Sequence, residues 1–199
     1  MRARRKAAGT KGGNSRVLVI LRRQDGRRGI RIVEFEVPKG TEISVKSGVI
    51  AVKGKLGSVE RNMLDNYVKV SMDGSNIKIH SSKKNKRTSG IVGTWASEIR
   101  NMFQGVQAGY EYEMKIDYTH FPMRVSVKGK QVVIENFLGE RSPRVADIIG
   151  NSKVSVKGDR VFISGIDKRD LGETAANVER ATKIKGFDLR VFQDGIYLL

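Results

Sequence analysis

The chain contains two copies of one sequence pattern. Ser44-Val45-Lys46 returns as Ser126-Val127-Lys128, and Leu56-Gly57 returns as Leu138-Gly139 at the same separation. Further matches, such as Lys69-Val70-Ser71 with Lys153-Val154-Ser155, follow at slightly different separations. Insertions and deletions in surface loops leave such drift between duplicated domains. Two copies are too few for a solenoid, so the repeat predicts two homologous domains of similar size.

The repeat also sets the domain boundaries. We expect a first repeat domain over residues 33–112, a second over residues 113–199, and an N-terminal extension over residues 1–32. Domains of this size bury enough surface to fold alone, although with a small margin. The hydrophobic fraction of 39% is ordinary for a globular protein, and no run approaches the roughly 20 apolar residues of a membrane span. We therefore expect a cytoplasmic protein without a membrane partner.

Within each copy, alternating apolar residues predict strands and a helical period predicts one helix. The first helix is expected over residues 92–106 with Thr88 or Ser89 as its N-cap, and the second over residues 170–185 with Asp170 as its N-cap. Each domain is thus predicted to be α+β, a small, mainly antiparallel sheet packed on one α-helix. The predicted strands are 17–21 in the extension, 30–37, 42–46, 49–53, 67–72 and 77–80 in the first copy, and 124–128, 131–135, 153–157, 160–164, 189–192 and 195–198 in the second.

Positive charge is concentrated near the N-terminus. The formal net charge is +17, and residues 1–33 carry eleven Lys and Arg against one acid, Asp25. A segment with this excess attracts polyanions, and the planar fork of arginine suits phosphate groups. We predict that the extension binds nucleic acid through Arg2, Arg4, Arg5, Lys6, Lys11, Arg16, Arg22, Arg23, Arg27 and Arg28.

A second set of basic residues falls in predicted loops and helix ends of the two domains. Few aromatic residues are expected at the surface, which argues against stacking of splayed single-stranded bases. Duplex-like RNA, in contrast, is bound through phosphates, sugars and 2′-hydroxyls and needs only basic and polar side chains. We therefore predict folded RNA as the partner, contacted by Lys83, Lys84, Lys86, Arg87, Arg141, Arg144, Lys168, Arg169, Lys183 and Lys185.

Residues suited to catalysis are not grouped in the sequence. The absence of cysteine excludes disulfides, thiolate metal sites and cysteine nucleophiles. His80 and His120 lie in different copies, and the acids at 111, 113 and 117 alternate along one strand face, where salt bridges explain them better than acid–base work. No phosphate-binding glycine motif is present. We predict no enzymatic activity, no metal, no cofactor and no small-molecule substrate.

Several longer segments resemble a known family. They are residues 94–106 (TWASEIRNMFQGV), 118–123 (YTHFPM), 135–141 (ENFLGER) and 188–197 (DLRVFQDGIY). All are similar to the archaeal and eukaryotic branch of the large-subunit ribosomal protein L-six family, and the resemblance extends from about Val33 to the C-terminus.

This resemblance implies a structural constituent of the large ribosomal subunit that binds large-subunit rRNA near the sarcin–ricin loop and the stalk base. Neighbouring large-subunit proteins and translation-factor GTPases would lie nearby. The second domain would be the main rRNA binder, which adds Arg190 to the expected contacts. One alternative is a free-standing RNA chaperone or regulator built on the same duplicated fold. Another is a nucleic-acid enzyme, which needs acids or histidines gathered in one cleft.

Overall fold

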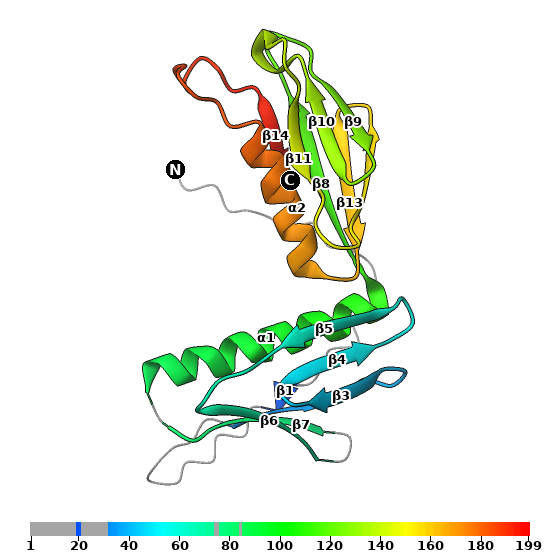
Figure 1. The fold of residues 1–199 in the computed structure, drawn as a ribbon, viewed down its shortest axis with the longest axis vertical. Coiled ribbons are helices and arrows are strands. Elements are labelled where there is room, and N and C mark those ends of the chain that lie inside the picture. Colours follow the sequence, from blue (N-terminus) through cyan, green and yellow to red (C-terminus); the bar gives the residue numbers. More distant parts are fainter. Residues whose placement is uncertain (1–18, 21–31, 74–75, 84) are drawn as a thin grey trace.

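The computed structural model describes residues 19–20, 32–73, 76–83 and 85–199 of the chain. It contains two domains, each with antiparallel strands and one long helix (Figure 1). The predicted duplicated α+β fold is therefore confirmed. The predicted contacts Arg2 to Arg28 of the extension, and Lys84, lie outside the described residues.

Domain one consists of two small antiparallel sheets and the helix α1 (Lys86–Ala108). Its core contains the fully buried side chains of Phe35, Ile50, Ile79 and Phe103, contributed by both sheets and the helix. The four-stranded sheet has the order β1-β2-β7-β6, with β1 Val19–Ile20, β2 Ile32–Glu36, β6 Val68–Asp73 and β7 Asn76–Ser81. The three-stranded sheet has the order β3-β4-β5, with β3 Glu42–Lys46, β4 Val49–Lys53 and β5 Ser58–Asn62.

Domain two repeats this arrangement around the helix α2 (Lys168–Ala181). Its edge strand β14 (Gly195–Leu198) pairs with β8, just as the edge strand β1 of domain one pairs with β2. The two edge strands differ in their place in the sequence, because β14 follows the helix of its domain and β1 precedes β2. The four-stranded sheet has the order β12-β13-β8-β14, with β8 Tyr110–Asp117, β12 Lys153–Lys157 and β13 Arg160–Gly165. The three-stranded sheet has the order β11-β10-β9, with β9 Arg124–Lys128, β10 Gln131–Glu135 and β11 Arg144–Asp147; the 3-10 turn η1 (Phe137–Gly139) follows β10.

The first helix begins earlier than the sequence predicts. Its N-cap is Asn85, whose side-chain oxygen accepts a hydrogen bond from the backbone N–H of Thr88 at 2.7 Å. The Thr88 hydroxyl accepts in turn from the backbone N–H of Asn85 at 3.3 Å, which completes a capping box. The prediction that Thr88 or Ser89 is the cap was wrong, because Thr88 occupies the third helical position. At the other end, Gly109 closes the helix with φ 73°, a conformation that favours glycine.

The second helix is also displaced from its prediction. Its N-cap is Asp167, which accepts from the backbone N–H of Arg169 at 2.9 Å, and Asp170 lies in the first turn. The helix ends at Ala181, several residues before the predicted end at 185. A long-range contact explains this end, since the guanidinium of Arg144 donates to the carbonyl oxygens of residues 181 and 183 at 2.8 and 3.1 Å.

The segment before the last strand differs from the prediction as well. Residues 189–192 do not form a strand, because the Asp188 carboxylate accepts from the backbone N–H of Arg190 at 2.9 Å and folds the chain into a turn. The Asp188 carbonyl accepts from the backbone N–H groups of Val191 and Phe192. Strand β14 consequently pairs with β8 rather than with its sequence neighbour.

The two domains meet where α1 passes into β8. Because β8 belongs to the sheet of domain two, the chain crosses between domains at Gly109, a few residues before the predicted boundary between residues 112 and 113. Figure 1 shows α1 and the strands of domain one below this crossing, with α2 and the strands of domain two above it. The positions of α1 and α2 therefore determine where the lysines and arginines near the helix ends lie.

Candidate nucleic-acid interface

The N-terminal end of α2 presents two of the predicted cations at the domain junction. Lys168 and Arg169 are exposed in the first helical turn, directly after the cap Asp167. The Lys168 Nζ atom lies 5.7 Å from the centre of the Tyr110 ring, at the start of β8. Both cations therefore stand at a helix end that lies beside the start of β8, where the chain passes between the domains.

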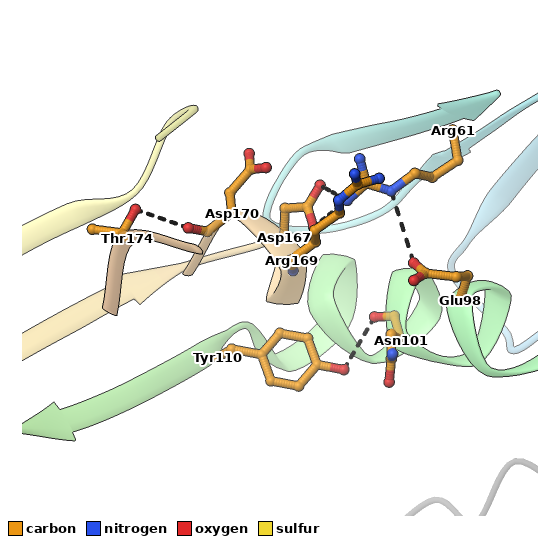
Figure 2. Close-up of polar contacts among 8 residues, drawn as sticks. All are labelled: Arg61, Glu98, Asn101, Tyr110, Asp167, Arg169, Asp170 and Thr174. Carbon is orange, nitrogen blue, oxygen red and sulfur yellow. Dashed lines mark hydrogen bonds and ion pairs between the residues drawn. The ribbon is translucent and has the colours of Figure 1, made fainter. Parts of the chain in front are cut away.

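An ion pair between the domains fixes this helix end. Arg61 on β5 donates from Nη2 to both carboxylate oxygens of Asp167, at 2.6 and 2.7 Å (Figure 2). The two side chains are only 19% and 17% exposed, so water screens the pair less than it screens a pair on the open surface. The Arg61 Nε atom also lies 3.8 Å from a carboxylate oxygen of Glu98 on α1. One arginine of domain one thus ties together β5, α1 and the first turn of α2.

Close packing supports the same junction. Gly105 of α1 is buried against the backbone carbonyl of Ile166, and a Cβ atom at position 105 would stand only 2.0 Å from that oxygen. Beside it, the Tyr110 hydroxyl donates to the Asn101 carbonyl at 3.2 Å (Figure 2). Burial, together with Tyr112 and Asp167, raises the pKa of Tyr110 to about 12. The phenol therefore stays a neutral hydrogen-bond donor throughout the physiological range.

At the opposite end of α2, the half-buried Arg144 is bound to other parts of the protein. Its guanidinium donates to both oxygens of Glu140, at 2.6 and 2.8 Å, in addition to its bonds to the helix-end carbonyls. It also lies 4.2 Å from the centre of the Phe137 ring. The hydrogen bond from Arg144 holds the pKa of Glu140 below its usual value. This arginine organises the end of α2 and brings the loop after β10 next to Lys183.

The other predicted cations at this end are exposed. Lys183 and Lys185 follow the helix, Arg141 lies in the loop before β11, and Arg190 lies in the turn before β14. Apolar side chains are exposed in the same turn, with Phe187 52% and Leu189 64% accessible. This part of the surface is more aromatic than the sequence led us to expect. It offers RNA both phosphate-binding charge and a ring face on which a base can stack.

The predicted cations of domain one lie far from both groups. Lys86 and Arg87 are exposed in the first turn of α1, and Lys83 in the preceding loop lies 4.1 Å from the centre of the Tyr67 ring. With a rise of 1.5 Å per residue, the 23 residues of α1 place these cations about 34 Å from the domain junction. The 14 residues of α2 separate its own two basic ends by about 20 Å. The structure therefore distributes those predicted site residues that it describes over an extended surface and does not gather them in one pocket.

The acids and histidines of the described residues do not form a cluster suited to catalysis or metal binding. Glu113 forms an ion pair with Arg160, and Asp117 forms one with Lys115 at 2.9 Å, as expected for acids that neutralise a basic surface. His120 stacks near Phe192, with ring centres 4.6 Å apart. Over the described residues, no group of three or more His, Asp or Glu side chains could hold a metal ion. Among the helices of the described residues, none is long and apolar enough to cross a membrane.

Arg61 is a residue of the site that sequence reasoning did not identify. Its partner Asp167 lies 106 positions away, in the other copy, so no local sequence pattern predicts the pair. The only available signal is an arginine at a strand position whose duplicate, Ala146, is not basic.

A duplicated α+β scaffold with exposed cations at its helix ends, and with acids such as Glu113 and Asp117 in ion pairs, is typical of proteins that bind polyanions. Comparison with known proteins identifies the family. The family model described as ribosomal protein L6 matches residues 37–109 and 121–195, one match in each domain. The chain belongs to the ribosomal protein L6 family.

Individual relatives agree with this assignment. The large ribosomal subunit protein uL6 of Thermoplasma acidophilum is 60% identical over 165 residues, which cover 83% of this chain and 93% of that protein. The corresponding protein of Picrophilus torridus is 58% identical over 166 residues, covering 83% and 92% of the two chains. That of Methanocella arvoryzae is 48% identical over 169 residues, covering 84% and 96%.

Family membership confirms the resemblance found in the sequence, including its archaeal character. It makes this chain a structural constituent of the large ribosomal subunit rather than an enzyme, in agreement with the sequence prediction.

Proposed function

We propose that this protein binds large-subunit rRNA near the sarcin–ricin loop and the stalk base, and thereby supports the region where translation-factor GTPases bind. It does so within ribosomes of the cytoplasm, beside neighbouring large-subunit proteins. Domain two is the main rRNA binder, and domain one provides a second body that is attached to it through the junction around Arg61. The N-terminal extension, residues 1–32, adds contacts through its excess of arginine.

The exposed cations at the two ends of α2 carry this proposal. Lys168 and Arg169 stand at one end, and Lys183 and Lys185 at the other, about 20 Å away. Cations at this separation reach phosphates on different turns or strands of a folded RNA, which favours recognition by shape over recognition by sequence. The ion pair between Arg61 and Asp167 holds the first turn of α2, and the cations on it, against domain one.

Cosedimentation and footprinting of assembled subunits test the proposal. The full-length protein should remain with the large subunit after a moderate salt wash, whereas a free RNA chaperone or regulator would be released. The double variant Arg141→Gln, Lys185→Gln should remain folded and lose protection of nucleotides around the sarcin–ricin loop. Lys46→Gln, Lys69→Gln is the control with the same change in charge, because both lysines are exposed on strands of domain one. Unchanged protection in the double variant, with the protein still bound, would contradict the proposed contact.

A further inference from the structure

Strands β9 and β12 form a basic surface that the predicted site residues do not include. They lie side by side where the two sheets of domain two meet. On β12, Lys153 and Lys157 are exposed, while Val154 and Val156 between them pack against the core. We call the exposed cations on these two strands, Arg124, Lys128, Lys153 and Lys157, the β9–β12 stripe.

The duplication supplies an internal reference for this stripe. The equivalent positions of domain one, on β3 and β6, also lie on strands that run side by side. The stripe in domain two consists of four cations, whereas the equivalent positions of domain one hold two cations and two acids. The formal charge of these four positions is +4 in domain two and 0 in domain one. The counterpart residues of domain one, the β3–β6 stripe, are Glu42, Lys46, Lys69 and Asp73.

The middle strands reduce this difference without removing it. Domain one has Lys53 on β4, directly opposite Glu42, and domain two has Glu135 on β10, directly opposite Arg124. With these residues included, the two surfaces carry +1 and +3. Glu135 is not a strong partner, because its nearest approach to Lys128 is 3.9 Å and the pair is largely exposed. In domain one, by contrast, Asp73 accepts a hydrogen bond from Lys78 at 2.5 Å.

Folding does not account for the stripe. The inward positions are apolar in both copies, with Ile43 and Val125 as one matched pair and Val70 and Val154 as another, all packed against the cores. The same scaffold therefore forms with a neutral or a basic outer face. Like charges on neighbouring strands repel one another and cost stability, so a concentration of four cations favours a polyanionic partner.

Spacing and chemistry indicate which polyanion fits. Residues four apart on a strand are separated by about 13 Å, so each strand presents two cations at that interval, and the two strands form parallel rows. Ser155 and Ser126 lie between the cations of their strands and add hydroxyl groups. Cations and hydroxyls on a shallow surface, without an exposed aromatic ring among these strand residues, match a helical RNA backbone rather than unstacked bases.

We infer that the β9–β12 stripe binds the sugar–phosphate backbone of a double-helical segment of rRNA. This inference rests on the proposed function and adds a second RNA-binding face to it. Figure 1 shows α2 on one side of domain two and β9 and β13 on the other, so the stripe does not belong to the cations around α2. Domain two then lies between two RNA segments, with one contacted at the ends of α2 and the other along the strands.

Two double variants of the full-length protein, with equal changes in net charge, test the inference. Lys153→Gln, Lys157→Gln removes two cations from the stripe, and Lys46→Gln, Lys69→Gln removes two from its duplicate in domain one. Binding to a short RNA duplex is measured over a series of salt concentrations. For the stripe variant, the slope of log affinity against log salt should fall by about 1.8, or about 0.9 for each lost phosphate contact, with little change for the domain-one variant. Circular dichroism confirms that both variants are folded.

Three outcomes would overturn the inference. Equal losses of slope in both variants would mean that only total charge matters, and unchanged slopes in both would mean that the stripe does not touch RNA. A stripe variant that leaves the subunit while its duplex-binding slope is unchanged would identify an acidic protein as the partner. Failure of this inference can be distinguished from failure of the proposed function. The proposed function requires that the wild-type protein cosediments with large subunits, and that result does not depend on the stripe variant.

Discussion

The contact between Gly105 and Ile166 makes a quantitative prediction about the domain junction. A Cβ atom at position 105 would stand 2.0 Å from the Ile166 carbonyl oxygen and 3.1 Å from its carbonyl carbon. The first distance is about 1.5 Å short of ordinary van der Waals contact, and the obstacle is backbone, which cannot rotate away. Gly105→Ala must therefore push the start of α2 away from α1.

Two opposing terms decide the sign of the effect. Replacing glycine by alanine inside a helix stabilises it by up to about 1 kcal/mol, because alanine restricts the unfolded chain. Forcing a methyl group into a filled space costs about 1 to 3 kcal/mol, and displacement of α2 also weakens the ion pair between Arg61 and Asp167. We expect Gly105→Ala to lower the free energy of unfolding by about 1 to 2 kcal/mol. Gly93→Ala, in the same helix with no atom within 4 Å of the new Cβ, should raise it by up to about 1 kcal/mol.

Urea unfolding followed by two probes measures this difference. Trp95 is the single tryptophan and lies on α1 against the core of domain one, so its fluorescence reports that domain, while far-ultraviolet circular dichroism reports both. The two probes must be compared because a two-domain protein can unfold in more than one step. If Gly105→Ala proved as stable as Gly93→Ala by both probes, the close approach of α1 to residue 166 would not exist in solution.

Three further predictions concern single interactions. A double-mutant cycle on Arg61→Ala and Asp167→Asn should give a coupling free energy of about 1 to 3 kcal/mol by urea unfolding. Asparagine at position 167 keeps an oxygen that can cap α2. A coupling free energy near zero would show that the two side chains do not stabilise the junction. As pH rises from 10 to about 12, the unfolded state loses the Tyr110 proton while the folded state keeps it, so the free energy of unfolding falls. In unfolding curves measured on both sides of pH 10, Tyr110→Phe should lose less stability than the wild-type protein. Equal losses in the two proteins would refute the raised pKa. Asn85→Ala should destabilise α1 by about 1 kcal/mol in thermal unfolding, with no change if the capping box is absent.

Features with a local physical cause could be predicted from the sequence. The strands on either side of Gly129 and Gly158 follow from alternating apolar residues and a turn, and each predicted pair forms in the structure. The core side of α1 follows from its helical period, and residues such as Ile99 and Phe103 are fully buried. Duplication reinforced these predictions, since each copy supports the interpretation of the other.

Features that depend on distant contacts could not be predicted. Strand β5, Ser58–Asn62, has a polar sequence and is held by pairing with β4 and by the contact of Arg61 with the other domain. The end of α2 depends on Arg144, which is far along the chain from the Ala181 carbonyl to which it donates. Arg144 was predicted as an RNA contact, and nothing in the sequence indicated that its guanidinium also bonds to Glu140 and to the backbone. A sequence shows that an arginine is present, and only the fold decides whether its donors are already used.

The same distinction guides the search for RNA contacts across the whole surface. Cations that form ion pairs and hydrogen bonds within the protein, such as Arg61 and Arg144, set the geometry of the domains. Cations on exposed positions that replace acids in the other copy, such as Lys157 in place of Asp73, change the charge without changing the packing. Since the inward positions are apolar in both copies, the packing of the scaffold does not require this charge difference. Removing a cation of the first kind should therefore reduce stability more than RNA affinity, and removing one of the second kind should do the reverse.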